Sequence, residues 1–294
     1  MKIIKNYPLT SFFILAFTIT WTLQLTGIVL ASQQSMVLSN ETNFLYFTDF
    51  LKMKLPPAQL LAYGLFTLGM GPLISAILVT SITEGKSGLK NLWQQCTKWN
   101  VGIKWYLIAL GLPILLSVVS VGIGWLASGG QLTYTLKLPV EKFIPFFLYM
   151  LIFTGISEEP GWRGFALPRL QSRYNAEKAS WILGILWGIW HFPFIIYYTY
   201  HAGVVPLLFS FLGLTLGIVG WTLVNTWIYN NTSSVLIIIL LHGWGNTVQS
   251  YLVLSSNDMT AQSLYGILPW AIAIILMRIY GNENLSHQPR PQIP

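Results

Sequence analysis

Three short groups of residues in this sequence are suited to chemistry, and each has a spacing that fits one helical turn. They are Glu158, Glu159 and Arg163; Trp187 and His191; and His242 and Asn246. Side chains four residues apart share one face of a helix, so Glu159 would lie beside Arg163, Trp187 beside His191 and His242 beside Asn246. Ionisable side chains inside apolar segments are costly unless they are paired or face a wet cavity, and functional use is therefore the default interpretation.

The two adjacent carboxylates are the strongest signal. Glu158 and Glu159 are two of nine acidic residues in the chain, and they follow the apolar stretch 143–156. Two like charges this close cannot both stay ionised cheaply unless a cation neutralises one of them. Arg163 is spaced to pair with Glu159, which leaves Glu158 as a free base. A carboxylate in a dry cavity, assisted by His191, can hold and deprotonate a water molecule, as peptide hydrolysis requires.

The remaining polar residues of the expected spans suggest supporting roles. His242 and Asn246 are suited to donate hydrogen bonds to the oxyanion that develops on an attacked carbonyl group. Trp162 and Trp187 flank the acidic and histidine groups and are candidates to line the same cavity, with packing or interfacial roles as the alternative. Asn225 is a candidate for a buried hydrogen bond between helices.

Composition indicates that these groups lie within a membrane. The chain has 294 residues, of which 54% are hydrophobic and only 9% charged. Several apolar runs approach or exceed the ~20 residues that cross ~30 Å of hydrocarbon. We therefore predict an all-α polytopic membrane protein, a bundle of about eight transmembrane helices. The expected spans are residues 9–31, 60–81, 105–126, 143–158, 180–200, 207–229, 234–253 and 264–279.

The segments around the second span carry their own signals. Residues 32–57 have the composition of a polar loop. Gly69, Gly71 and Pro72 favour close helix packing or a kink. Residues 83–104 are basic and predict a short amphipathic helix at the membrane interface, with an ordinary basic loop as the alternative.

The chain reads as one unit. We expect a single integral-membrane domain over residues 1–285, with its core motifs in 143–251. No internal repeat of fixed period is visible. A polar, proline-rich tail over residues 286–294 is expected to be disordered.

The expected depths of the three groups agree poorly. With ~1.5 Å of rise per residue, Glu158 would lie near the cytoplasmic end of its span, whereas His191 and His242 would lie ~15 Å into theirs. Two explanations are open. Either the fifth and seventh spans begin outside the hydrocarbon, or the chain folds back after Pro160 and Gly161.

Basic residues set the expected orientation. With the N-terminus inside, twelve of the 16 Lys and Arg residues lie on the inner side and four on the outer side. Both termini are therefore expected to be cytoplasmic. The net charge of +7 reflects this topology and contact with membrane lipid, and no nucleic-acid motif competes with that explanation.

In type and order the three groups resemble the motifs of the CPBP family, the CAAX protease and bacteriocin-processing membrane proteins. The family motifs are Glu-Glu-x-x-x-Arg, aromatic-x-x-x-His and His-x-x-x-Asn, found here at 158–163, 187–191 and 242–246. The resemblance implies an eight-helix intramembrane endopeptidase in a bacterial cell membrane, acting on a peptide or membrane-protein substrate. It also implies that Glu158 activates water with His191, while the residues of the third motif stabilise the oxyanion.

Three alternatives stand beside this interpretation. A zinc-dependent version of the protease would use Glu158, His191 and His242 as ligands. That ligand set would leave only Glu159 as the general base, and Arg163 is spaced to neutralise the charge of Glu159. We therefore expect no metal and no cofactor. A non-proteolytic immunity or scaffold protein would keep the fold without turnover. A transporter would use the same acids, but matching repeats that would indicate one are not found.

Overall fold

The computed structural model describes residues 2–290, and over this range the chain forms helices and no strand. The predicted all-α class is therefore confirmed. The α-helices are α1 Lys2–Asn6, α2 Pro8–Gln33, α3 Asn40–Leu51, α4 Pro57–Thr67, α5 Gly71–Thr83, α6 Gly85–Cys96, α7 Ile103–Ala127, α8 Phe143–Met150, α9 Ser157–Glu159, α10 Leu167–Gln171, α11 Ala176–Trp190, α12 Phe192–Thr199, α13 Val204–Thr232, α14 Val235–Val248 and α15 Met259–Tyr280. Short 3-10 or π segments occupy Val140–Lys142, Leu151–Ile156, Pro160–Ala166, Tyr200–Ala202, Gln249–Val253 and Leu254–Ser256.

Six helical segments of the described range are long and apolar enough to cross a membrane. Two further pairs pass the same test together but are bent, α4 with α5 by 58° and α11 with α12 by 47°. Counting each bent pair as one span gives eight, in agreement with the predicted bundle.

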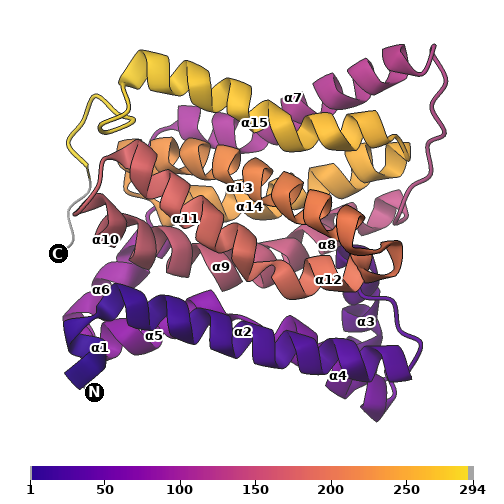
Figure 1. Ribbon diagram of the computed structural model, residues 1–294, viewed down its shortest axis with the longest axis horizontal. Coiled ribbons are helices and arrows are strands. Elements are labelled where there is room, and N and C mark those ends of the chain that lie inside the picture. Colours follow the sequence, from indigo (N-terminus) through magenta and orange to yellow (C-terminus); the bar gives the residue numbers. More distant parts are fainter. Residues whose placement is uncertain (1, 291–294) are drawn as a thin grey trace.

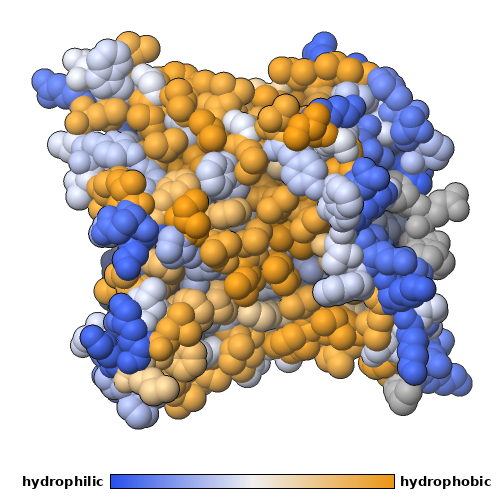
Figure 2. All heavy atoms as spheres, turned by 180° about the vertical axis from the view of Figure 1, so that it is seen from behind, coloured by the Kyte–Doolittle hydropathy of each residue, from blue (hydrophilic) through white to orange (hydrophobic). Residues whose placement is uncertain are grey.

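The helices run along a common direction and end at two polar faces. α1, α5, α6 and α10 lie towards one end of the molecule, and α3, α4 and α12 towards the other (Figure 1). Figure 2 shows apolar side chains across the middle of the molecule and hydrophilic ones gathered at both ends. This distribution matches a hydrocarbon layer between two aqueous sides, and the chain is an integral membrane protein.

The predicted kink in the second span is the break between α4 and α5. Thr20 of α2 bridges the broken backbone: its Oγ1 donates to the carbonyl oxygen of Gly69 at 2.8 Å and accepts from the N–H of Gly71 at 3.2 Å. A Cβ atom on Gly71 would clash with the carbonyl oxygen of Ala16, so only glycine permits this approach. The break is tolerated at membrane depth because protein groups satisfy the freed backbone atoms.

The prediction that residues 32–57 form a loop is wrong, because α3 lies within this segment. Ser39 Oγ accepts from the N–H of Thr42 at 3.1 Å, and the N–H of Ser39 donates to Thr42 Oγ1 at 2.8 Å. This is a reciprocal capping box in which threonine replaces the usual Glu or Gln, which hid the helix start in the sequence. In the neighbouring basic segment, α6 forms as predicted.

The start of the expected tail contacts the helices. Ser286 Oγ donates to Asn231 Oδ1 at 3.0 Å, and Arg290 donates to the carbonyl oxygens of Gln171 and Tyr174 at 3.0 and 2.6 Å. Residues 291–294 of the expected tail lie outside the described residues.

Cysteine labelling would test the orientation. Burial raises the pKa of the native Cys96 thiol to about 12, so it should react slowly and give little background. We expect Lys98→Cys, just beyond α6, to be labelled by a membrane-impermeant maleimide only when the cytoplasmic face is accessible. Lys137→Cys is the matched control and should be labelled only from outside. The opposite pattern would reverse the orientation.

Candidate active site

The two carboxylates lie in the middle of a long helical segment rather than at the end of a span. The candidate span Val140–Gln171 has 32 residues, so the predicted end of the fourth span at Glu158 is wrong. No fold-back follows Pro160: the chain continues through Pro160–Ala166 into α10. This placement removes the mismatch in depth, because Glu158 lies at mid-span.

Wide turns explain why the helix continues through residues that usually end one. π segments precede and follow α9, at Leu151–Ile156 and Pro160–Ala166. Pro160 stands at the start of the second, where its missing N–H is least costly. π turns of this kind are often found at functional sites, because they shift the direction of side chains relative to a regular helix.

Small residues bring α14 against this helix. A Cβ atom on Gly155 would lie 2.7 Å from the carbonyl oxygen of Ile239, and one on Gly243 would lie 2.8 Å from Cα of Leu151. Neither helix could hold a side chain at these points without moving apart. The close contact places His242, next to Gly243, within reach of the acidic pair.

Glu159 is the centre of a buried ionic cluster. Both Glu159 and Arg163 are fully buried, and Arg163 Nη1 donates to Glu159 Oε1 at 3.0 Å and to Oε2 at 2.8 Å. His242 Nδ1 donates to Glu159 Oε1 at 2.7 Å. The guanidinium of Arg163 also lies 4.2 Å from the ring centre of Trp187. Glu159 and Arg163 thus pair as their spacing predicts, whereas no spacing in the sequence predicts the bond from His242 to Glu159.

Glu158 has a different environment from Glu159. Its Oε2 accepts hydrogen bonds from two indole N–H groups, that of Trp187 at 2.8 Å and that of Trp162 at 3.4 Å. Among the described residues, none donates to its Oε1. Glu158 is buried, 6% exposed, yet it lines a cavity. One oxygen is therefore held in place and the other is available to a ligand.

The cavity has a volume of about 450 Å³ and unites most of the predicted site residues. Its walls include Glu158, Trp187, His191, His242 and Asn246. His191 Nδ1 donates to the carbonyl oxygen of Trp187 at 2.9 Å, which leaves Nε2 as the free ring nitrogen. In His242 the bond to the acidic cluster likewise leaves Nε2 free. The three motifs thus converge on one space from three helices.

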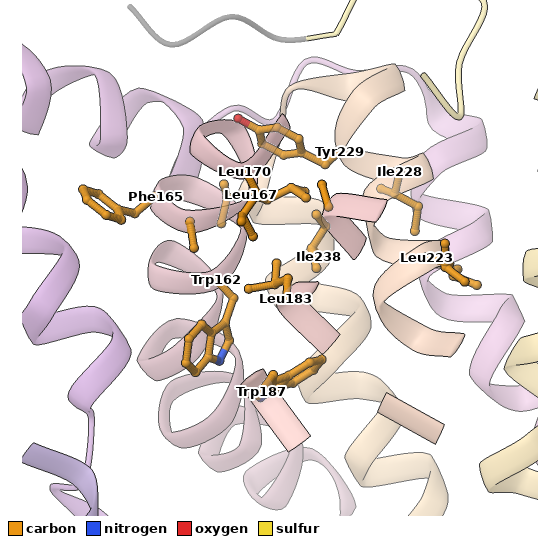
Figure 3. Packing of buried hydrophobic residues seen from close by; sticks show 14 of the residues in the cluster. Trp162, Phe165, Leu167, Leu170, Leu183, Trp187, Leu223, Ile228, Tyr229 and Ile238 are labelled. Atoms are coloured by element: carbon orange, nitrogen blue, oxygen red, sulfur yellow. The ribbon is translucent and has the colours of Figure 1, made fainter. Parts of the chain in front are cut away.

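Of the two candidate tryptophans, Trp162 does not line the cavity. It is fully buried and packs edge-on against Phe12 and Trp190, at ring-centre distances of 5.6 and 5.8 Å. Trp162 and Trp187 lie together at the lower end of the apolar cluster drawn in Figure 3. Trp162 therefore supports Glu158 from the packed side, whereas Trp187 both supports it and forms the wall.

Among the carboxamides that line the cavity outside the predicted motifs, two are buried, Asn225 and Asn43. Asn225 of α13 does not form the expected bond between helices: its Oδ1 has no hydrogen-bond partner among the described residues. Asn43 of α3 is in the same state, and no motif or spacing in the sequence marks this residue.

His, Cys, Asp and Glu are the side chains that could hold a metal ion in this site. Within residues 2–290, no three or more His, Cys, Asp or Glu side chains are grouped so that they could hold one ion. In His242 and His191, the Nδ1 atoms already bond to Glu159 and to a carbonyl oxygen. Nε2 of each ring remains free, and it is the absence of a grouped ligand cluster among the described residues that bears on zinc.

Glu159→Gln should destabilise the fold strongly. The substitution leaves the fully buried Arg163 without its counter-charge, and loss of one partner of a buried pair costs about 3–5 kcal/mol. Thermal unfolding in detergent measures the effect. Glu84→Gln is the matched control, because Glu84 pairs with Arg169 where both side chains still reach solvent, and it should cost clearly less. Equal losses would contradict the assigned role of Glu159.

Known proteins resemble this chain in the segment that carries the site. Residues 140–248 match the family model described as Type II CAAX prenyl endopeptidase Rce1-like. CAAX prenyl protease 2 of Methanococcus maripaludis is 32% identical over 139 residues, which cover 46% of this chain and 50% of the relative. The chain thus spans about half the length of this relative. The segment matched by the family model contains all three motifs, so the similarity to these CAAX-type endopeptidases covers the residues that form the site.

Proposed function

We propose that the chain is an intramembrane endopeptidase that hydrolyses a peptide bond with a water molecule activated by Glu158. The observation that carries the proposal is the divided environment of this carboxylate. Oε2 is fixed by two indole N–H groups, and Oε1 faces a cavity that also holds His191, His242 and Asn246. The name of the M. maripaludis relative makes CAAX-type peptides the first substrates to assay.

In the proposed reaction Glu158 is the base and then the acid. Oε1 takes a proton from water while the water oxygen bonds to the carbonyl carbon of the substrate. The free Nε2 of His191 accepts the second water hydrogen and so orients the attack. Glu158 then returns its proton to the amide nitrogen as the carbon–nitrogen bond breaks, which yields a carboxylic acid and an amine.

We assign stabilisation of the oxyanion to the third motif, His242 and Asn246. Asn246 donates through its amide N–H, and His242 donates through Nε2. Since His242 Nδ1–H already bonds to Glu159, donation from Nε2 requires the imidazolium form. Two carboxylates, one guanidinium and one imidazolium then give a cluster without net charge, which suits a low-dielectric interior.

Glu158→Gln should lower kcat by about 10²–10⁴, the usual contribution of a general base. The fold should persist, because the amide oxygen can still accept from both indoles. Cleavage of a peptide library by purified protein, beside thermal unfolding, measures both effects. Glu141→Gln, which changes an exposed acid at the start of the same helical segment, should leave cleavage unchanged. Full activity of Glu158→Gln would contradict the proposal that Glu158 activates the water molecule.

We further propose that turnover needs no metal, and the absence of a grouped set of three potential ligands within residues 2–290 supports this. Purified active protein should lack stoichiometric zinc and keep its activity in the presence of a chelator. Elemental analysis and activity assays on one preparation measure this. Activity lost to chelator and restored by zinc alone would return the two histidines to the role of ligands.

A further inference from the structure

The cavity lies on one side of Glu158 along the helical segment that carries this carboxylate. Within Val140–Gln171, its wall residues are found between Tyr149 and Glu158, and none of residues 159–171 lines it. The bent pair of α11 and α12 shows the same division, because its part of the wall begins at Trp187 in the last turn of α11. Both segments thus face the cavity with the half that leads to the end where α3, α4 and α12 lie (Figure 1).

The other helices contribute to the wall from the same half of the molecule. In α13 and α15, which start at this end, the wall residues lie within 213–225 and 265–266. α14, which ends there, lines the cavity only from Leu241 onward. Among the described helices at the opposite end, α1, α5, α6 and α10 contribute no wall residue.

Exposed and polar wall residues mark where the cavity meets its surroundings. Gly213 and Leu214 are exposed, in the first half of α13. Gln24, Asn40 and Gln249 are half-buried and polar, and Asn40 is the first residue of α3. All five lie in the half of the molecule that ends at α3, α4 and α12. The cavity therefore opens in this half.

The opposite half is closed by packed apolar side chains. Residues 159–168 are all buried, which is about three turns of helix beyond Glu158. Leu167, Leu183 and Ile238 are fully buried in one cluster, shown in Figure 3. Interiors packed in this way have few voids larger than a water molecule, so no passage for a peptide leads to Glu158 through this half. A separate hollow between α5, α6 and α10 measures only about 20 Å³ and shares no residue with the cavity.

The basic residues indicate which side of the membrane the open half faces. Lys and Arg are concentrated in cytoplasmic loops of membrane proteins. Eleven of them, the buried Arg163 not counted, lie towards the closed end. Four lie towards the open end, and they are Lys52, Lys54, Lys137 and Lys142. The open half of the cavity therefore faces away from the cytoplasm.

From this we infer that the site is entered from the extracytoplasmic side, and that its substrate is a peptide segment exposed on that side of the membrane. The inference rests on the proposed endopeptidase function and on the orientation given by the basic residues. It narrows the substrate class, because a chain confined to the cytosol cannot reach Glu158.

Modification of a cysteine in the cavity from one side of the membrane tests the inference without any need for turnover. Thr154 lines the cavity four residues before Glu158, and Thr154→Cys is the probe site. A charged, membrane-impermeant methanethiosulfonate should modify it in right-side-out membrane vesicles and not in inverted vesicles. Modification in inverted vesicles, or in neither kind before detergent is added, would overturn the inference.

The controls separate access through the cavity from leakage through the protein. Ser180→Cys is the matched control, because Ser180 is fully buried on α11 beyond the cavity and should resist the reagent in both kinds of vesicle. Its reaction in inverted vesicles would show that the packed half admits solutes, and it would contradict the inference. Wild-type protein measures the background from Cys96, and Lys98→Cys reports the orientation in the same vesicles. If Thr154→Cys does not fold, Gln249→Cys takes its place on the cavity wall.

Cleavage by the same vesicles distinguishes failure of the inference from failure of the proposed function. The probe is a peptide that purified protein cleaves, carrying a charged dye pair that cannot cross the membrane. Right-side-out vesicles should cleave it, inverted vesicles should do so only after detergent opens them, and Glu158→Gln should abolish both. Cleavage by intact inverted vesicles would overturn the inference and leave the function standing. If purified protein cleaves no peptide, the function fails, and the cysteine result alone decides the side of access.

Discussion

The buried pairing of Glu159 with Arg163 is the interaction on which the site depends. Both side chains are fully buried, and their bond lets two adjacent carboxylates occupy the middle of a membrane helix. Arg163 balances the charge of Glu159 and is not hydrogen-bonded to Glu158. The carboxylate of Glu158 is held by two indole N–H groups instead. The same carboxylate fixes one nitrogen of His242 and so directs the other to the cavity. Removal of this pair would affect all three motifs.

Much of the fold could be predicted from composition and hydropathy. The eight segments, the kink at Gly69 to Pro72 and the helix over Gly85–Cys96 follow from apolar length, small residues and amphipathic spacing. Two elements could not be predicted in this way. The capping box of α3 uses Thr42 in place of an acid, and the helix through Pro160 continues because π turns accommodate it. Local rules mark these residues as loop or terminus, and tertiary packing overrides them.

In the site, contacts along one helix could also be predicted from residue spacing, whereas contacts between helices depend on packing and could not. Spacing along one helix predicts that Glu159 pairs with Arg163, and the motif order predicts a shared cavity. The bond from His242 to Glu159 joins two helices whose relative height is set by Gly155 and Gly243, and no sequence pattern states that height. The mismatch in depth arises only if the fourth span ends at Glu158, whereas the helical segment continues to Gln171.

Glu158 can act as the base only if it is ionised, while the negative charge of Glu159 is balanced by Arg163 and His242. Infrared difference spectroscopy between wild type and Glu158→Gln in detergent tests this most directly, with ¹³C-labelled glutamate to identify the bands. We expect the substitution to remove an ionised carboxylate band at neutral pH. Loss of a protonated carboxyl band instead would show that Glu158 carries a proton at rest, and it would contradict its role as the base.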